Sequence, residues 1–86
     1  MNDRIIHTYL SNQIHSYNEE KRNELLPGQT KIFEGGLIDS ISFVLLVEDI
    51  QENFNIKIYP NELINNNFES IQSLISFIKS KMKNDE

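Results

Sequence analysis

The chain has 86 residues, a formal net charge of −5 at pH 7 and no cysteine. A chain of this length forms one domain with a modest core, which leaves little room for an enclosed active site. The missing cysteines exclude disulfides and thiolate metal sites, and the acidic charge argues against nucleic acid as a partner. No run approaches the roughly eighteen apolar residues of a membrane span, and no secretory signal opens the chain. We therefore expect a cytoplasmic monomer.

Negative charge is concentrated in the middle of the chain. Residues 32–56 contain no lysine or arginine, but they contain Glu34, Asp39, Glu48, Asp49 and Glu52. An ordinary solvated face explains such an interval, and so does a docking surface that attracts basic partners. The docking hypothesis gains weight because the interval brackets Ser40, the residue on which the functional argument turns.

The first helix is predicted over about residues 3–17, with Asn2 or Asp3 as its cap. Its apolar stripe recurs at spacings of three and four and consists of Ile6, Leu10, Ile14 and Tyr17. His7 and His15 have no carboxylate or cysteine at ligand spacing. We interpret both histidines as surface or boundary residues, and we predict no metal site.

Residues 18–39 are predicted to form a long loop. Leu25 and Leu26 are expected to tuck against the core, and Ile32 and Phe33 to anchor the loop to it. Gly35-Gly36 indicates a flexible bend or one with positive φ. So long a connection allows the helices on either side of it to run in the same overall sense.

The second helix is predicted over about residues 40–54. Its core stripe consists of Phe43, Leu46, Val47, Ile50 and Phe54. The opposite side carries Ile41, Val44, Leu45, Glu48 and Glu52. Apolar side chains mixed with carboxylates are typical of a partner-binding patch with an acidic rim, although half-buried Val44 and Leu45 would explain the pattern equally well.

The remaining elements are shorter, apart from the last helix. Residues 55–59 alternate like a strand but have no partner strand, so we expect an extended connector. A short helix follows over about residues 60–64, the asparagines at 65–67 are expected to break it, and Phe68 is expected in the core. The last helix is predicted over about residues 70–82, capped by Glu69 or Ser70. The prediction is an all-α four-helix bundle, three helices long and one short, in a single domain over residues 1–86.

Ser40 stands at the expected start of the second helix, and three roles suit a serine there. A catalytic nucleophile needs a base and an oxyanion site, but the glycine pattern of a nucleophile elbow is missing and both histidines lie far along the chain. A structural N-cap is the common role of such a serine, but Asp39 is an equally good cap. If Asp39 caps the helix, the Ser40 hydroxyl remains exposed. It could then accept a phosphoryl-linked group, which a helix N-terminus stabilises.

The sequence resembles the acyl carrier protein family over about residues 30–80. The resemblance is carried by Phe33-Glu34-Gly35-Gly36-Leu37-Ile38-Asp39-Ser40-Ile41, by Glu52-Asn53-Phe54, by Ile56-Lys57-Ile58-Tyr59-Pro60 and by Phe68-Glu69-Ser70-Ile71. The first helix matches the family only in its pattern.

This resemblance implies a carrier that is not an enzyme. Ser40 would carry 4′-phosphopantetheine, transferred from coenzyme A by a separate phosphopantetheinyl transferase, and Asp39 would match the aspartate that contributes to that transfer. The thiol of the arm would hold an acyl or aminoacyl group as a thioester. The face read by partner enzymes would consist of Ile41, Val44, Leu45, Glu48 and Glu52.

Leu37 and Leu45 depart from the fatty-acid-synthesis carriers, which usually have glycine three residues before the serine and often a glutamate at the later position. Gly36-Leu37-Ile38-Asp39-Ser40 is more similar to D-alanyl and other stand-alone carriers that work with an adenylate-forming ligase. The cargo and the pathway, whether fatty acid, polyketide, peptide or D-alanylation, stay open. An alternative of another class is an unmodified helical module that only binds proteins.

Overall fold

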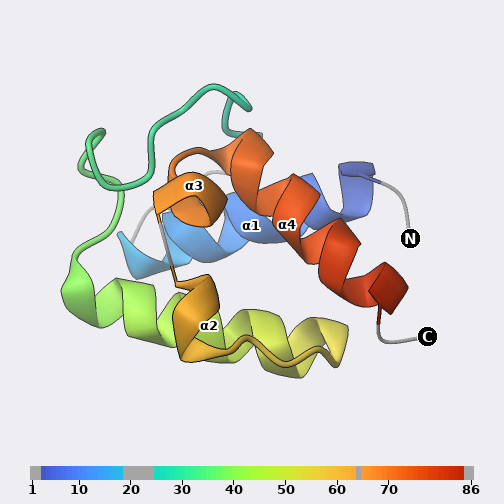
Figure 1. The fold of residues 1–86 in the computed structure, drawn as a ribbon. Helices are drawn as coiled ribbons and strands as arrows, with labels where there is room; N and C mark the ends of the chain where they lie inside the picture. The colour runs from blue at the N-terminus through green and yellow to red at the C-terminus, as the bar shows by residue number, and fades with distance from the viewer. Residues whose placement is uncertain (1–2, 19–24, 64, 85–86) are drawn as a thin grey trace.

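The computed structural model describes residues 3–18, 25–63 and 65–84. These residues form four α-helices and a 3-10 turn, with no strand among them (Figure 1). The elements are α1 (Asp3–Tyr17), α2 (Ser40–Phe54), the turn η1 (Pro60–Glu62), α3 (Asn65–Phe68) and α4 (Ile71–Asn84). Three long helices and one short one confirm the predicted all-α bundle.

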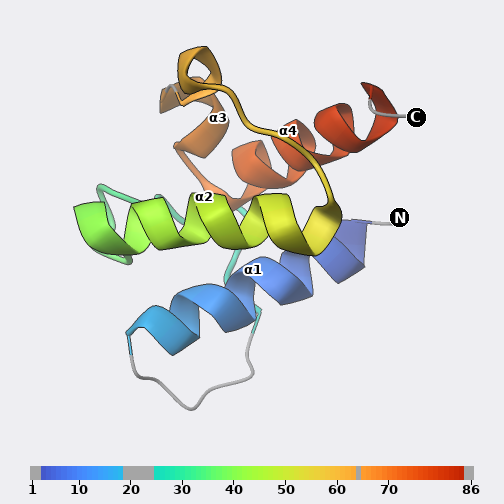
Figure 2. The same ribbon diagram turned by 90° about the horizontal axis from the view of Figure 1, so that it is seen from below.

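Helix α1 runs in the opposite sense to α2 and α4 (Figures 1 and 2). The long loop would allow the first two helices to share one sense, but they run in opposite senses. The reason lies in the loop before α2, whose backbone pairs with the start of α4. The Ile32 N–H donates to the Glu69 carbonyl at 3.0 Å, and the Ile71 N–H donates to the Thr30 carbonyl at 3.1 Å. The loop is thus held at one end of the bundle and enters α2 beside the last turn of α1 (Figure 2).

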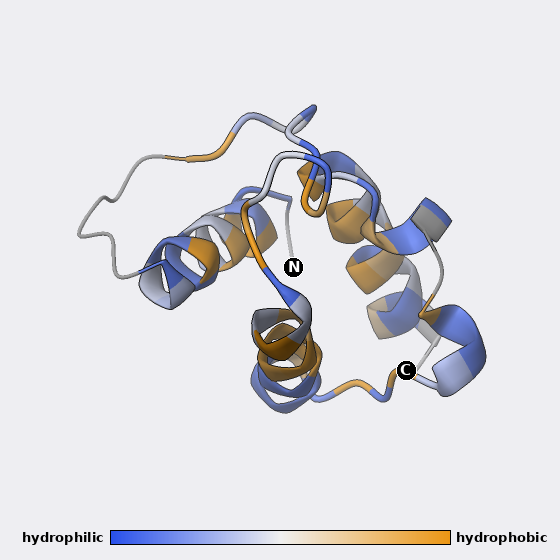
Figure 3. Ribbon diagram, turned by 90° about the vertical axis from the view of Figure 1, so that its left-hand side faces the viewer, coloured by the Kyte–Doolittle hydropathy of each residue, from blue (hydrophilic) through white to orange (hydrophobic). Residues whose placement is uncertain are grey.

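The core lies between α1, α2 and α4 and is closed by apolar side chains from the connections. Figure 3 shows the hydrophobic sides of α1 and α4 turned toward each other. The buried residues follow the predicted stripes, while Phe43, Val47, Tyr17 and Met82 pack against them half-buried. The connection after α2 contributes Ile56 and Ile58, each 7% exposed, as its alternating pattern predicted. The long-helix and connector residues of the core are Ile6, Leu10, Ile14, Leu46, Ile50, Phe54, Ile56, Ile58, Ile71, Leu74, Ile75, Phe77 and Ile78.

The short helix lies later in the chain than the sequence indicated. The prediction placed it over residues 60–64, followed by a break over residues 65–67, but the first segment contains only η1 and the asparagine run begins α3. The Asn67 side chain donates to the Glu62 carbonyl at 2.8 Å, and Phe68 is 2% exposed. Tertiary packing of Phe68 thus outweighs the low helix propensity of asparagine.

Two side chains near α1 differ from their predicted environments. His15 is buried rather than at the surface, because the buried side of α1 also includes Ser11 and is wider than its apolar stripe. His7 lies at the boundary, half-buried, with Nε2 in contact with the Leu26 carbonyl. Leu26 packs against the core, whereas Leu25, predicted beside it, is exposed.

Candidate functional site

A turn that contains Gly35 and Gly36 precedes the start of α2. Gly36 adopts a φ of 71°, in the left-handed region that favours glycine. Its N–H donates to the Phe33 carbonyl at 3.0 Å, and the Leu37 N–H donates to the Ile32 carbonyl at 3.1 Å. A Cβ atom on Gly35 would stand 2.5 Å from the Lys31 carbonyl oxygen, so the turn has no room for a side chain there. Both glycines are therefore required by the geometry of the turn.

Asp39 is the N-cap of α2. Its backbone is extended, and its Oδ1 accepts the Ser42 N–H at 2.8 Å. This backbone N–H, followed by the Ser42 hydroxyl, lowers the pKa of the Asp39 carboxyl below its usual value. Because Asp39 takes the cap, Ser40 becomes the first residue of the helix.

The two serines of the first turn have different surroundings. Ser40 is exposed, and its hydroxyl has no hydrogen-bond partner within residues 3–18, 25–63 and 65–84. Ser42 is half-buried, and its N–H donates to Asp39 Oδ1. The Ser40 hydroxyl is therefore on the more accessible of the two serines.

The predicted partner face forms one continuous stripe along α2, since its residues recur at helical spacing. Ile41 is 74% exposed, Val44 55% and Leu45 45%, and the carboxylates of Glu48 and Glu52 are exposed as well. The hypothesis that Val44 and Leu45 are merely half-buried does not hold. Three large apolar side chains thus lie in solvent beside two carboxylates.

Asp49 belongs to the other side of α2, although the sequence grouped it with the acidic face. Its Oδ2 accepts hydrogen bonds from the Tyr17 hydroxyl at 2.5 Å and from Gln13 Nε2 at 3.0 Å, both on α1. Its sequence position indicates this, because it directly precedes Ile50 of the core stripe and lies three residues after Leu46. Asp49 therefore ties α2 to α1.

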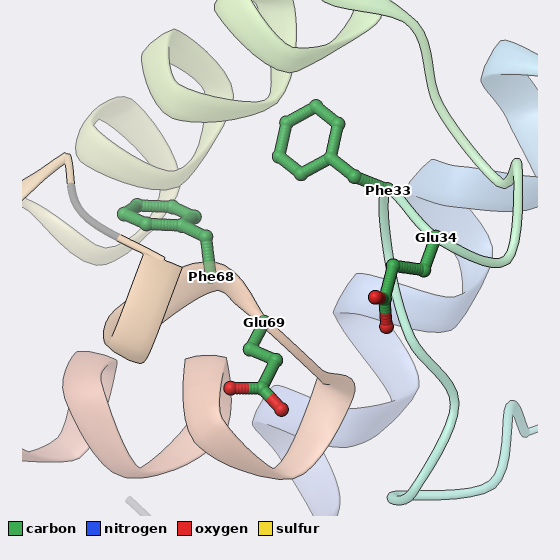
Figure 4. A pocket seen from close by; sticks show the side chains of 4 residues that line it. All are labelled: Phe33, Glu34, Phe68 and Glu69. Atoms are coloured by element: carbon green, nitrogen blue, oxygen red, sulfur yellow. The ribbon is translucent and has the colours of Figure 1, made fainter.

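A cavity of about 450 Å³ lies beside the first turn of α2 and is lined by Phe33, Glu34, Phe68 and Glu69 (Figure 4). The aromatic rings of this cavity continue into Phe43, whose centroid is 5.1 Å from that of Phe33 and 5.2 Å from that of Phe68. Phe33 is 43% exposed and lines the cavity, and its contact with Phe43 joins the loop to α2, as predicted for an anchor. Figure 4 shows the two carboxylates on the side of the cavity away from α2, and Glu69 is paired there with Lys31.

The part of the chain that the structure describes contains neither a metal-binding cluster nor a membrane-spanning helix. No three His, Cys, Asp or Glu side chains gather there in an arrangement that could hold a metal ion. None of its helices has both the length and the apolar character needed to cross a membrane.

Comparison with protein families gives a match to the phosphopantetheine attachment site family over residues 22–78. The chain belongs to this family. The matched segment begins before α2, contains all of α2, η1 and α3, and ends inside α4. A search of curated proteins gave no match.

Members of the family carry a covalently attached 4′-phosphopantetheine group and are carriers rather than enzymes, working with transferases and synthesis enzymes. The start of α2 fits such a group. It offers an exposed hydroxyl at the first position of a 15-residue helix, where unpaired N–H groups and the helix dipole favour a negatively charged phosphodiester.

Proposed function

We propose that Ser40 is the attachment point of 4′-phosphopantetheine and that the chain is a stand-alone carrier of acyl or aminoacyl thioesters. The observation that carries this proposal is the division of roles between neighbouring residues. Asp39 caps α2 through the Ser42 N–H, which leaves the Ser40 hydroxyl exposed at the helix N-terminus. Ser42 is the obvious competitor, but it is half-buried, whereas Ser40 is exposed.

Attachment requires a separate transferase, which binds coenzyme A and this chain together. The Ser40 oxygen forms a bond to the phosphorus next to the pantetheine, and the bond from that phosphorus to the bridging oxygen of the pyrophosphate breaks. Adenosine bisphosphate leaves, and the hydroxyl proton passes to a base of the transferase. When bound, the arm supplies a terminal thiol that holds the cargo as a thioester. The ionised Asp39 holds the first turn of α2 in place and keeps Ser40 outside the cap.

The outward face of α2 is proposed as the surface that partner enzymes contact. Ile41, Val44 and Leu45 expose apolar area that would be desolvated on docking. Glu48 and Glu52 provide the negative rim that steers a basic partner surface to this helix. The partners are the phosphopantetheinyl transferase, a loading ligase or transferase, and the enzymes that use the cargo.

A specialised acyl or aminoacyl cargo is favoured over the central fatty-acid role. The resemblance of Gly36-Leu37-Ile38-Asp39-Ser40 to D-alanyl and related stand-alone carriers supports this proposal. In the structure, Gly36 makes the left-handed turn and Leu37 packs against the core. The leucine therefore has a packing role that glycine at position 37 would lack.

The test is the intact mass of the purified chain after incubation with coenzyme A and a promiscuous phosphopantetheinyl transferase. We expect one added arm on the wild-type chain and on Ser42→Ala, and none on Ser40→Ala. A wild-type chain that gains no mass would instead support the unmodified binding module. An arm that persists on Ser40→Ala would move the attachment site elsewhere.

A further inference from the structure

The last turn of α1 reaches the segment that precedes Ser40. The Asn18 side chain donates from Nδ2 to the Leu37 carbonyl at 2.7 Å and to the Ile14 carbonyl of its own helix at 3.1 Å. The Asn18 backbone N–H is held by the Ile14 and His15 carbonyls, each at 3.2 Å. One amide group thus joins the end of α1 to a residue three positions before Ser40.

Both the backbone N–H and the backbone carbonyl of Leu37 form hydrogen bonds. Its N–H donates to the Ile32 carbonyl at 3.1 Å, inside the glycine turn, and its carbonyl accepts from Asn18. Beyond Leu37, the buried Ile38 and the cap residue Asp39 leave little freedom before Ser40. The orientation of the loop relative to α1 is therefore passed on to the first turn of α2.

We propose that Asn18 is a positioning residue for the attachment of the prosthetic arm, acting through Leu37 on Ser40. This inference rests on the proposed function of Ser40. Asn18 lies four residues before the family match begins at residue 22, so the match assigns it no role.

The structure also contains a second tether of the same loop to the same helix, which serves as a control. The Ser11 hydroxyl accepts the Leu26 N–H at 2.9 Å, and His7 contacts the Leu26 carbonyl. Leu26 lies far from Ser40 along the loop. A variant of this tether loosens the loop without releasing Leu37.

The expected consequence is kinetic. Without the Asn18 bond, the chain populates states in which Ser40 is displaced. Its apparent affinity for the transferase then falls in proportion to the fraction of molecules whose Ser40 is in the binding-competent position. The KM for the carrier therefore rises, while kcat at saturation stays unchanged because the bound complex selects the competent state. One lost hydrogen bond corresponds to a rise of about three- to tenfold.

The experiment measures initial rates of arm attachment against carrier concentration for the wild type, Asn18→Asp and Ser11→Ala. Asp keeps the size of Asn but removes both donated hydrogen bonds. We expect the higher KM only in Asn18→Asp, together with faster amide hydrogen exchange at Leu37, whose N–H donates to the Ile32 carbonyl. In Ser11→Ala, faster exchange is expected at Leu26 instead.

The outcomes separate this inference from the proposed function. Equal KM values in the wild type and Asn18→Asp would overturn the positioning role and leave the attachment at Ser40 intact. A similar rise in both variants would also overturn it, because general loosening would then explain the effect. A wild-type chain that accepts no arm would overturn both proposals.

Discussion

The two sides of α2 have similar apolar character but opposite surroundings. On the inner side, Leu46 and Ile50 are fully buried, and Phe54 meets Tyr9 of α1 edge to face with ring centroids 5.1 Å apart. On the outer side, the stripe from Ile41 to Glu52 is exposed. Apolar content alone therefore does not tell which side of this helix stabilises the fold.

The acidic residues of α2 also differ between its two sides. Asp49 is satisfied within the chain by the Tyr17 hydroxyl and by Gln13, whereas Glu48 and Glu52 face solvent. We infer that substitutions on the inner side act on stability, while substitutions on the outer side act on partner binding. Pairs of neighbouring residues on opposite sides provide the sharpest tests.

The largest effect is expected from Leu46→Ala, with Leu45→Ala as its matched control. Leu46 is fully buried, so its truncation leaves a cavity and lowers the free energy of unfolding by roughly 2–5 kcal/mol. Leu45 is 45% exposed, and its truncation is expected to change that free energy by less than about 1 kcal/mol while slowing loading by partner enzymes. Urea denaturation followed by circular dichroism measures the first quantity. Similar losses of stability in the two variants would remove the distinction between the sides.

The second effect concerns binding and comes from reversing the outer charges together, Glu48→Lys with Glu52→Lys. Exposed rim charges act mainly on the association rate, so we expect loading by a basic partner to slow by about tenfold at low salt, and the difference to shrink as salt screens the charges. Helicity is expected to stay unchanged. Loading at the wild-type rate would show that the acidic rim plays no part in docking.

The sequence was sufficient where local chemistry decides the structure. Asp39 before Ser40 offered one of two possible caps, the one that leaves Ser40 exposed. Gly35-Gly36 indicated a flexible bend or one with positive φ, and periodicity located the long helices. It was insufficient where distant residues decide. The burial of His15 and the helix formed by the asparagine run both depend on contacts with other elements. The Asn18 bond to Leu37 likewise joins residues whose proximity no local pattern shows.

The smallest effect is expected from the tyrosines of α1 that pack against the inner side of α2. Burial, with the charges of Asp49 and Glu52, raises the pKa of Tyr9 to about 12. Burial and the bond to Asp49 also raise the pKa of Tyr17. Unfolded tyrosine titrates near pH 10, so the folded chain holds these phenol protons more tightly. Their contribution to stability is complete below about pH 10 and declines as the pH rises toward the folded values.

Tyr17→Phe removes one of these phenols and the bond to Asp49 while keeping the ring. We expect the free energy of unfolding at pH 7 to fall by about 1–2 kcal/mol and its decline above pH 10 to become shallower, as measured by urea denaturation from pH 7 to pH 11. The matched control is Tyr59→Phe, because Tyr59 is 48% exposed. That substitution is expected to leave the stability at pH 7 unchanged. If both variants lose the same stability, the bond between Tyr17 and Asp49 contributes nothing specific to the stability of the fold.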